Sequence, residues 1–208
     1  MKLKIKWKLF LFSVLSFGLS SDNPIKKIQF SKADSLWSIY KQMDAPGMAV
    51  AVIKEGKVFY KRTYGLANLE SKTPITDSTA FNIASVSKQF TAFIALLAEQ
   101  EGKLSLYDDI RVYQPELSHL PYKITIRQLA NHTHGLPNFS EIKKLQGFGD
   151  EFKVTNTEAV HTLLQIKNVN FPPGEQYQYN NTGFTLLAEI LLRVYKKKFS
   201  QIAKEYVF

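Results

Sequence analysis

The sequence predicts an α+β fold, in which a helical region packs on an antiparallel sheet and only the N-terminal hairpin of that sheet is present. Two runs rich in β-branched and aromatic residues, 48–53 and 57–64, are joined by a short turn containing Gly56, a pattern typical of a β-hairpin. Several later segments repeat apolar residues at helical spacing. No second set of strands is evident, and a two-stranded ribbon is marginally stable alone. The hairpin therefore needs partner strands.

The chain opens with the pattern of a secretory signal peptide. Four lysines in the first eight residues precede an uncharged apolar run over 9–19, and small residues follow at Gly18, Ser20 and Ser21. We expect a signal peptide over 1–20 and a single partial domain over 21–208. The apolar run is short for a membrane span, so we expect cleavage rather than an anchor. The sequence thus predicts a periplasmic or secreted protein with no stable membrane insertion after cleavage.

Composition narrows the function classes. The 208 residues are 45% hydrophobic and 22% charged, which is typical of a globular protein with a real core. The absence of cysteine excludes disulfides, thiol nucleophiles and a lipid-modified N-terminal cysteine. Without residues 1–20, which hold four lysines and no acidic residue, the formal charge falls from +9 to +5. The cations are scattered apart from those in 193–198, so we expect no nucleic-acid partner. The sequence leaves the oligomeric state open.

The first half of the chain contains three further predicted elements besides the hairpin, two helices and a loop. Apolar residues at helical spacing predict an amphipathic helix over 32–43. The polar, turn-rich segment 66–80 predicts a loop. The apolar segment that follows Ser85 predicts a buried helix that ends at Gly102, where a glycine suits the C-cap.

The second half predicts mainly helices and turns. Segment 103–137 predicts short helices and turns around one cluster of leucine and isoleucine, and 138–152 is loop-like. Asn156 or Thr157 can cap a helix that runs to about residue 166. After a Pro-Pro-Gly turn comes an extended aromatic segment, and a final amphipathic helix is expected from near Phe184.

One serine–lysine pair lies where a nucleophilic serine could be activated. S-x-x-K occurs three times, starting at Ser38, Ser85 and Ser140, but only Ser85 stands at the first turn of a long apolar helix. Free backbone N–H groups and the helix dipole there favour negative charge on an attacking oxygen. Lys88 lies on the same helix face, so its amine can reach the Ser85 hydroxyl and, if neutral, take its proton. That role requires a lowered lysine pKa. The alternative is a simple helix cap beside a solvated lysine.

A second motif supports the chemical interpretation. The only Y-x-N in the chain, Tyr179 to Asn181, lies in the extended segment after the Pro-Pro-Gly turn. Alternating residues of an extended chain point the same way, so a phenol and an amide would face one cleft. Together they offer a proton carrier and a hydrogen-bond donor for a substrate carbonyl. Taken alone, Tyr179 would be an interface aromatic among ten tyrosines.

These motifs resemble those of the serine β-lactamase and penicillin-binding protein superfamily. The similar branch carries Y-x-N in place of S-D-N: class C β-lactamases, D-Ala-D-Ala carboxypeptidases and related esterases. The resemblance runs through PGMAVAVIKEGKVFYKRTYGLAN, FNIASVSKQFTAFIALLAEQEGKLSLYDDI, ITIRQLANHTHGLP and FPPGEQYQYNNTGFTLLAEIL. It implies a β-lactamase/transpeptidase-like fold without a cofactor. By this resemblance Ser85 is the nucleophile, Lys88 its activating partner, Tyr179 the general base and acid, and Asn181 a substrate hydrogen-bond donor. The Ser85 backbone N–H would form half of the oxyanion hole.

The chain also departs from the family pattern. The family carries a third motif, lysine or histidine followed by threonine or serine and glycine, on a late strand, and nothing after Asn181 fits it. We expect the N-terminal half to two thirds of a family member, which exposes a sheet edge and folds poorly when isolated.

Two functions follow from these observations. The first is an exported serine hydrolase acting through an acyl-enzyme on β-lactams, D-alanyl peptides of peptidoglycan, D-amino-acid amides or esters. The alternative is a truncated product that is catalytically inert or binds acyl ligands without turnover.

The NHTHG sequence has two interpretations. His132 and His134 could form a metal pair, joined by His119 or His161. No acidic ligand lies nearby in sequence, and the similar family has an NHTSG-like loop with a structural role beside its cleft, so we expect no metal site. The acidic pair 108–109 also matches the family and is expected to cap local structure.

Overall fold

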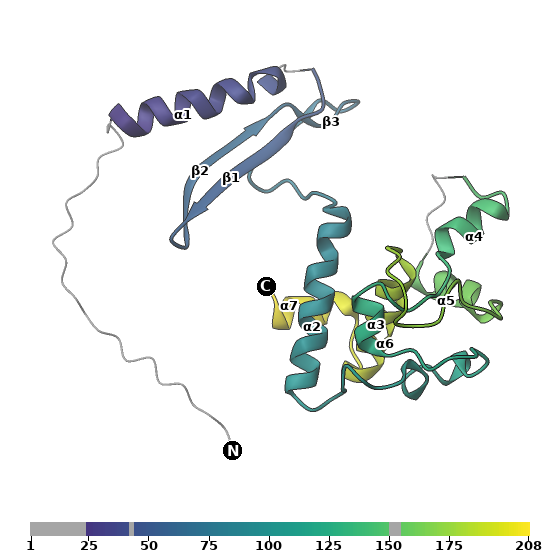
Figure 1. Ribbon diagram of the computed structural model, residues 1–208. Helices are drawn as coiled ribbons and strands as arrows, with labels where there is room; N and C mark the ends of the chain where they lie inside the picture. Colours follow the sequence, from purple (N-terminus) through teal and green to yellow (C-terminus); the bar gives the residue numbers. More distant parts are fainter. Residues whose placement is uncertain (1–23, 42–43, 150–154) are drawn as a thin grey trace, which may run out of the picture. The chain divides into compact units, whose positions relative to one another are not determined.

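The computed structural model describes residues 24–41, 44–149 and 155–208. The expected signal peptide over 1–20 lies outside the described residues. The chain divides into two compact units, residues 1–82 and 83–208. In Figure 1 the first unit holds the strands and the second, from teal to yellow, consists of helices and loops.

The predicted hairpin is confirmed. Strand β1 (Met48–Lys54) pairs antiparallel with β2 (Lys57–Tyr64). The two residues between them, Glu55 and Gly56, have φ angles of 51° and 71°. A two-residue turn with both φ angles positive is type I′, whose twist matches that of the strands. Among the described residues each sheet has only two strands.

The first helix differs from its prediction. Helix α1 runs from Pro24 to Leu36 and is followed by a 3₁₀ turn, η1 (Ser38–Lys41), instead of one helix over 32–43. Proline suits the first position of a helix because its φ is preset and its missing N–H would have no partner there. The apolar spacing therefore identified a helical region but not its ends.

Helix α1 packs on the hairpin within the first unit (Figure 1). The Phe30 ring lies 5.5 Å from that of Phe59 and 5.6 Å from that of Tyr60. The Tyr60 hydroxyl donates to the Asp34 carboxylate at 2.8 Å. Burial raises the pKa of Tyr60, and the hydrogen bond from Tyr60 lowers the pKa of Asp34. At neutral pH Tyr60 therefore stays protonated and Asp34 stays ionised.

Segment 66–80, predicted as a loop, contains a second small ribbon. Strand β3 (Leu66–Asn68) pairs with β4 (Thr73–Pro74). The Asn68 side chain accepts the Ser71 N–H at 2.7 Å, which closes the turn between them. Strands this short leave no alternation to detect in a sequence.

The second unit begins with the segment that carries Ser85. A 3₁₀ turn, η2 (Ala84–Ser87), leads directly into α2 (Lys88–Gln100). Gly102 then takes a left-handed φ of 68°, and the Lys103 N–H donates to the Ala98 carbonyl at 2.9 Å. This is the glycine-terminated helix end that the sequence predicted.

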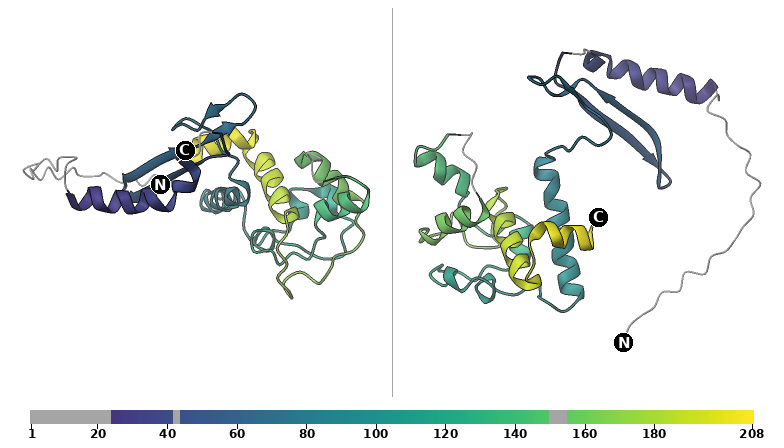
Figure 2. Two further views of the ribbon diagram at one scale, coloured as in Figure 1. Left: turned by 90° about the horizontal axis from the view of Figure 1, so that it is seen from above. Right: turned by 180° about the vertical axis from the view of Figure 1, so that it is seen from behind.

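The other elements of the second unit surround α6. They are η3 (Ile110–Val112), η4 (Pro115–Leu117), α3 (Ile126–Ala130), α4 (Phe139–Leu145), α5 (Asn156–Leu164), α6 (Thr182–Tyr195) and α7 (Phe199–Tyr206). Helix α6 contacts α2, α3, α5 and α7, and Figure 2 shows α7, in yellow, lying across α2. The core contains the predicted leucine and isoleucine cluster, with Ile94, Ile110, Leu117, Ile124, Ile126, Leu129, Leu136, Leu163, Leu186, Leu187, Ile190 and Leu191 buried.

Three predicted boundaries are corrected. Segment 138–152, predicted as a loop, contains α4, which Asn138 caps by accepting the Ser140 N–H at 3.3 Å. Helix α5 is capped by Thr155, whose hydroxyl accepts the Glu158 N–H at 3.2 Å, rather than by Asn156 or Thr157. Helix α6 starts at Thr182, not near Phe184.

The acidic pair 108–109 caps local structure as expected. Asp109 accepts the Arg111 N–H at 3.0 Å at the start of η3. Asp108 accepts the Ser105 N–H at 2.7 Å and the Tyr113 hydroxyl at 2.6 Å. No helix in the described part of the chain is long and apolar enough to cross a membrane.

Candidate active site

Ser85 lies in a tight turn just ahead of the helix. The sequence placed it in the first turn of the apolar helix, whereas the structure places it in η2, with α2 starting three residues later at Lys88. Ala84, immediately before it, has a φ of 45°. A left-handed φ is unfavourable for a residue with a Cβ and persists where the surroundings enforce it. This turn leaves Ser85 exposed.

The four predicted site residues meet around the Ser85 hydroxyl. Lys88 Nζ lies 2.9 Å from Ser85 Oγ. The Tyr179 hydroxyl lies 2.7 Å from the same Oγ. Lys88 Nζ also donates to Asn181 Oδ1 at 2.9 Å. Residues from the two ends of the second unit therefore form one connected polar cluster.

Packing of two helices brings these residues together. Lys88 is the first residue of α2, Asn181 is the N-cap of α6, and these helices pack on each other. Tyr179 lies in the non-helical stretch before α6. The sequence predicted that alternation in an extended chain would align Tyr179 with Asn181. They do face one cluster, but Asn181 already has helical dihedral angles, φ −84° and ψ −20°.

The electrostatics of the cluster favour a reactive phenol. The neighbouring Lys88, together with the hydrogen bond to Ser85, lowers the pKa of Tyr179. Lys88 Nζ lies 5.0 Å from the centre of the Tyr179 ring. Both the ammonium and the phenol are placed to donate to Ser85 Oγ. Removing one proton from the lysine–tyrosine pair turns one of them into an acceptor for the serine proton.

His132 is a neighbour of the site that sequence reasoning missed. Its ring lies 4.4 Å from that of Tyr179 and 5.2 Å from that of Phe184. The sequence offered it as a metal ligand or as part of a structural loop, and its position 47 residues before Tyr179 gave no local signal of a contact with that residue. The resemblance to a loop beside the cleft was the one indication of its place.

His134, the other member of the pair, is buried and neutral. Its Nδ1 accepts the Leu136 N–H at 2.9 Å, and its Nε2 has no partner among the described residues. Burial, aided by His132, lowers the pKa of His134 to about 4. No group of three or more acidic or histidine side chains in the described segments is arranged to hold a metal ion.

Comparison with known proteins identifies the family. The family model described as Beta-lactamase matches residues 38–208. The chain belongs to the β-lactamase family. The predicted β-lactamase/transpeptidase-like α+β fold is thereby confirmed. FmtA from Staphylococcus aureus has the same fold, with a TM-score of 0.71 at 20% identity over 90% of this chain and 48% of that chain.

Two curated relatives of this β-lactamase-family chain are a D-aminopeptidase and a penicillin-binding protein by name. A D-aminopeptidase of Brucella anthropi is 32% identical over 78% of this chain and 31% of its own length. Penicillin-binding protein 4* of Bacillus subtilis is 30% identical over 76% of this chain and 35% of its own length. The chain spans about a third of the length of these relatives.

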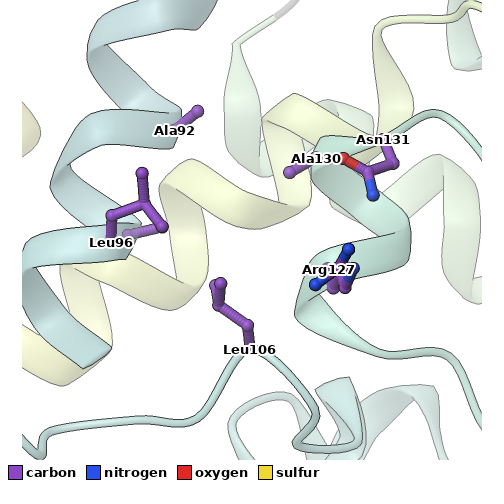
Figure 3. A pocket seen from close by; sticks show the side chains of 7 residues that line it. Ala92, Leu96, Leu106, Arg127, Ala130 and Asn131 are labelled. Atoms are coloured by element: carbon purple, nitrogen blue, oxygen red, sulfur yellow. The ribbon is translucent and has the colours of Figure 1, made fainter. Parts of the chain in front are cut away.

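Two cavities lie near α2 of this β-lactamase-family chain. One, of about 270 Å³, adjoins the cluster and is lined by Ala84, Ser87, Lys88, Thr91, Phe139, Asn156, Asn181, Phe184, Thr185 and Ala188. The other, of about 260 Å³, lies between α2 and α3 and has mostly alkyl walls with Arg127 and Asn131 beside them (Figure 3). Only the first includes predicted site residues, so it is the cavity in which a substrate can reach Lys88.

Proposed function

We propose that the protein is a serine hydrolase that acts through an acyl-enzyme on Ser85. The observation that carries this proposal is the position of Ser85 Oγ within 2.9 Å of Lys88 Nζ and 2.7 Å of the Tyr179 hydroxyl. A serine hydroxyl is a weak nucleophile unless a neighbouring base takes its proton. Here two groups able to exchange protons lie in direct contact with it.

Acylation begins with proton transfer from Ser85 to Tyr179. The lowered pKa of Tyr179 favours its phenolate form, which the Lys88 ammonium stabilises. Ser85 Oγ then attacks the substrate carbonyl carbon, and the bond to the leaving group breaks as Tyr179 returns the proton to that group. A water molecule, deprotonated by the same phenolate, later attacks the ester carbonyl on Ser85, and Tyr179 passes the proton to Ser85 Oγ as the acid product leaves.

Asn181 has a separate role in binding. Its Oδ1 accepts a hydrogen bond from Lys88. The amide orientation is thus set, and the Nδ2 donors remain for a substrate carbonyl. The same contact holds Lys88 beside Ser85 rather than in solvent.

The proposed substrates carry an activated or peptide-like carbonyl: β-lactams, D-alanyl peptides of peptidoglycan, D-amino-acid amides or esters. The named activities of the relatives, a D-aminopeptidase and a penicillin-binding protein, support this range. The signal-like pattern over 1–20 supports action in the periplasm or outside the cell, where peptidoglycan is found. The mechanism uses no cofactor.

The second candidate function is binding of acyl ligands without turnover. The observation behind it is that nothing after Asn181 in the printed sequence fits the third motif of the family, lysine or histidine followed by threonine or serine and glycine. The chain also spans only about a third of the length of the matched relatives.

Two measurements on one protein distinguish these functions. Incubation with a fluorescent penicillin reports acylation, and release of product from a chromogenic ester reports turnover. A hydrolase gives both, and Ser85→Ala loses both. A stable label without product release supports the binding function. If Ser85→Ala labels as fast as the parent protein, the nucleophile assignment is wrong.

A further inference from the structure

His132 holds the backbone on both sides of Tyr179. Its carbonyl oxygen accepts the Gln178 N–H at 2.9 Å. Its Nδ1 accepts the Asn180 N–H at 3.4 Å. Gln178 and Asn180 are the two chain neighbours of Tyr179. A single residue from the loop after α3 thus fixes the peptide units that flank the proposed base.

The His132 ring also covers the face of Tyr179. The two ring centres lie 4.4 Å apart with planes inclined by 42°. His132 is 8% exposed and has a left-handed φ of 59°. A histidine in this conformation is held there by its surroundings, at a cost in free energy. This backbone conformation places the His132 ring against Tyr179.

We propose that His132 is a positioning residue for Tyr179 and that acylation of Ser85 requires its neutral imidazole. This inference rests on the proposed function. Nδ1 accepts a backbone N–H, so in the observed arrangement its proton is absent and Nε2 carries the ring hydrogen. Protonation of Nδ1 would place its N–H against the backbone N–H of Asn180, and two donors cannot form a hydrogen bond with each other. The contact that fixes one flank of Tyr179 would then be lost.

The charges around His132 act in the same direction. Four titratable side chains face His132: Lys88 on α2, Tyr177 and Tyr179 in the segment before α6, and His134 in the same loop as His132. No described carboxylate contacts the imidazole. Burial and the Lys88 charge lower the pKa of His132 below its usual value. The imidazole is therefore neutral at neutral pH. The proposed requirement for a neutral His132 is met there, and the acylation rate should fall more steeply once the pH drops below the usual histidine value of about 6.5.

The test is the pH profile of Ser85 acylation by an uncharged fluorophosphonate. The full chain is compared with His132→Asn and with His161→Asn, a control at an exposed histidine on α5. Asparagine tolerates a left-handed φ and can accept the Asn180 N–H, but it does not titrate and has no ring to cover Tyr179. We expect the acid limb in His132→Asn to lose the part that follows the histidine and to keep only the one-proton dependence of the proposed base Tyr179, with a rate at pH 7.5 lower by about tenfold from lost positioning. His161→Asn should keep the parent profile. An unchanged acid limb in His132→Asn overturns the inference.

A second readout does not depend on activity. In Ser85→Ala protein, ¹⁵N spectra of the imidazoles report the tautomer and titration of His132, and the Tyr179 ring protons report its environment. We expect an Nε2–H tautomer and Tyr179 shifts that follow the His132 titration. If the chemical shifts of the Tyr179 ring protons do not change as His132 titrates, the inference is contradicted. This readout remains valid even if His132→Asn fails to fold. If no variant is acylated, the proposed function fails, and these spectra still decide the positioning role.

Discussion

At the scale of single residues, the site depends on two proton donors that share one acceptor. The Tyr179 hydroxyl and Lys88 Nζ both contact Ser85 Oγ, and Lys88 also binds Asn181. In the proposed reactive state Tyr179 has lost its proton. The hydrogen bonds from Lys88 and Ser85 lower the pKa of Tyr179 and so favour this state.

Removal of one phenol oxygen tests the role of Tyr179. Tyr179→Phe should lower the rate of Ser85 acylation about 10²- to 10⁴-fold, because the acceptor of the serine proton is lost while the ring still packs on His132. Tyr177→Phe is the matched control, since Tyr177 is an exposed tyrosine that also contacts the His132 ring. Equal rates for the two variants would contradict the role of Tyr179 as base.

The buried His134 makes stability depend on pH. Its folded pKa of about 4 lies below the unfolded value of about 6.5, so between these values only the unfolded chain binds the proton. The free energy of unfolding should therefore fall as the pH drops from 7 to 4, by about 3 kcal/mol from this group. Urea denaturation measures it. His134→Gln should flatten the dependence and His161→Gln should not. The same slope in His134→Gln would count against this explanation.

The sequence predicted which residues lie together in the candidate site but not which residues support them. The short motifs place Ser85 beside Lys88 and Tyr179 near Asn181 because helix and chain geometry act over a few residues. His132 could not be placed in this way. Its ring reaches Tyr179 only through the packing of the loop after α3 on the segment before α6, and no local pattern encodes such a contact.

At the scale of elements, the close approach of α6 to α3 sets the position of Asn181. Gly183, the second residue of α6, lies directly against α3. A methyl group there would lie 2.7 Å from the Leu129 carbonyl oxygen and 2.7 Å from His134 Nε2. Neither the backbone of α3 nor the buried imidazole can move away easily. Glycine at this position allows the start of α6 to reach Lys88.

The direction in which Gly183→Ala changes the free energy of unfolding tests whether α6 packs tightly on α3. Helix propensity alone would stabilise the protein by about 1 kcal/mol. The steric contact should instead lower the free energy of unfolding by about 1–3 kcal/mol. Chemical denaturation at neutral pH measures the change. A gain in stability would show that α6 has room to move and that the approach to α3 is not tight.

Elements with a local signal were predicted and those without one were missed. The hairpin was found because two runs rich in β-branched and aromatic residues enclose a turn with Gly56, and α2 because its apolar run ends at Gly102. Helix α4 was missed because it is only seven residues long and buries no residue fully, so its three apolar residues, Phe139, Ile142 and Leu145, are too few to stand out from a loop. The Thr155 cap was displaced by one residue because adjacent residues have similar capping preferences.

At the scale of the whole molecule, every proposed site residue belongs to the unit 83–208. The first unit holds the hairpin and α1, and exposed residues without helix or strand structure, 80–82, connect it to the second. Segments of this kind are the preferred sites of proteolysis. The proposed site residues and the strands of the hairpin thus lie in separate parts of the sequence.

Limited chymotrypsin digestion should therefore cut first after Phe81, a half-exposed residue. The expected product is a fragment that begins at Asn82 and carries all four predicted site residues. Mass spectrometry of early time points identifies the first cut. Initial cleavage inside α2 or α6 would contradict the division into two compact units.

The central claim is that Ser85 is the nucleophile, and mapping of a covalent adduct tests it most directly. The full chain is reacted with a fluorophosphonate or a penicillin, digested, and the modified peptide is identified by mass spectrometry. Ser38 and Ser140, which head the other two S-x-x-K sequences, are internal controls. We predict an adduct on Ser85 alone, lost in Ser85→Ala. A folded chain with unmodified Ser85, or with label spread equally over the three serines, would contradict the account.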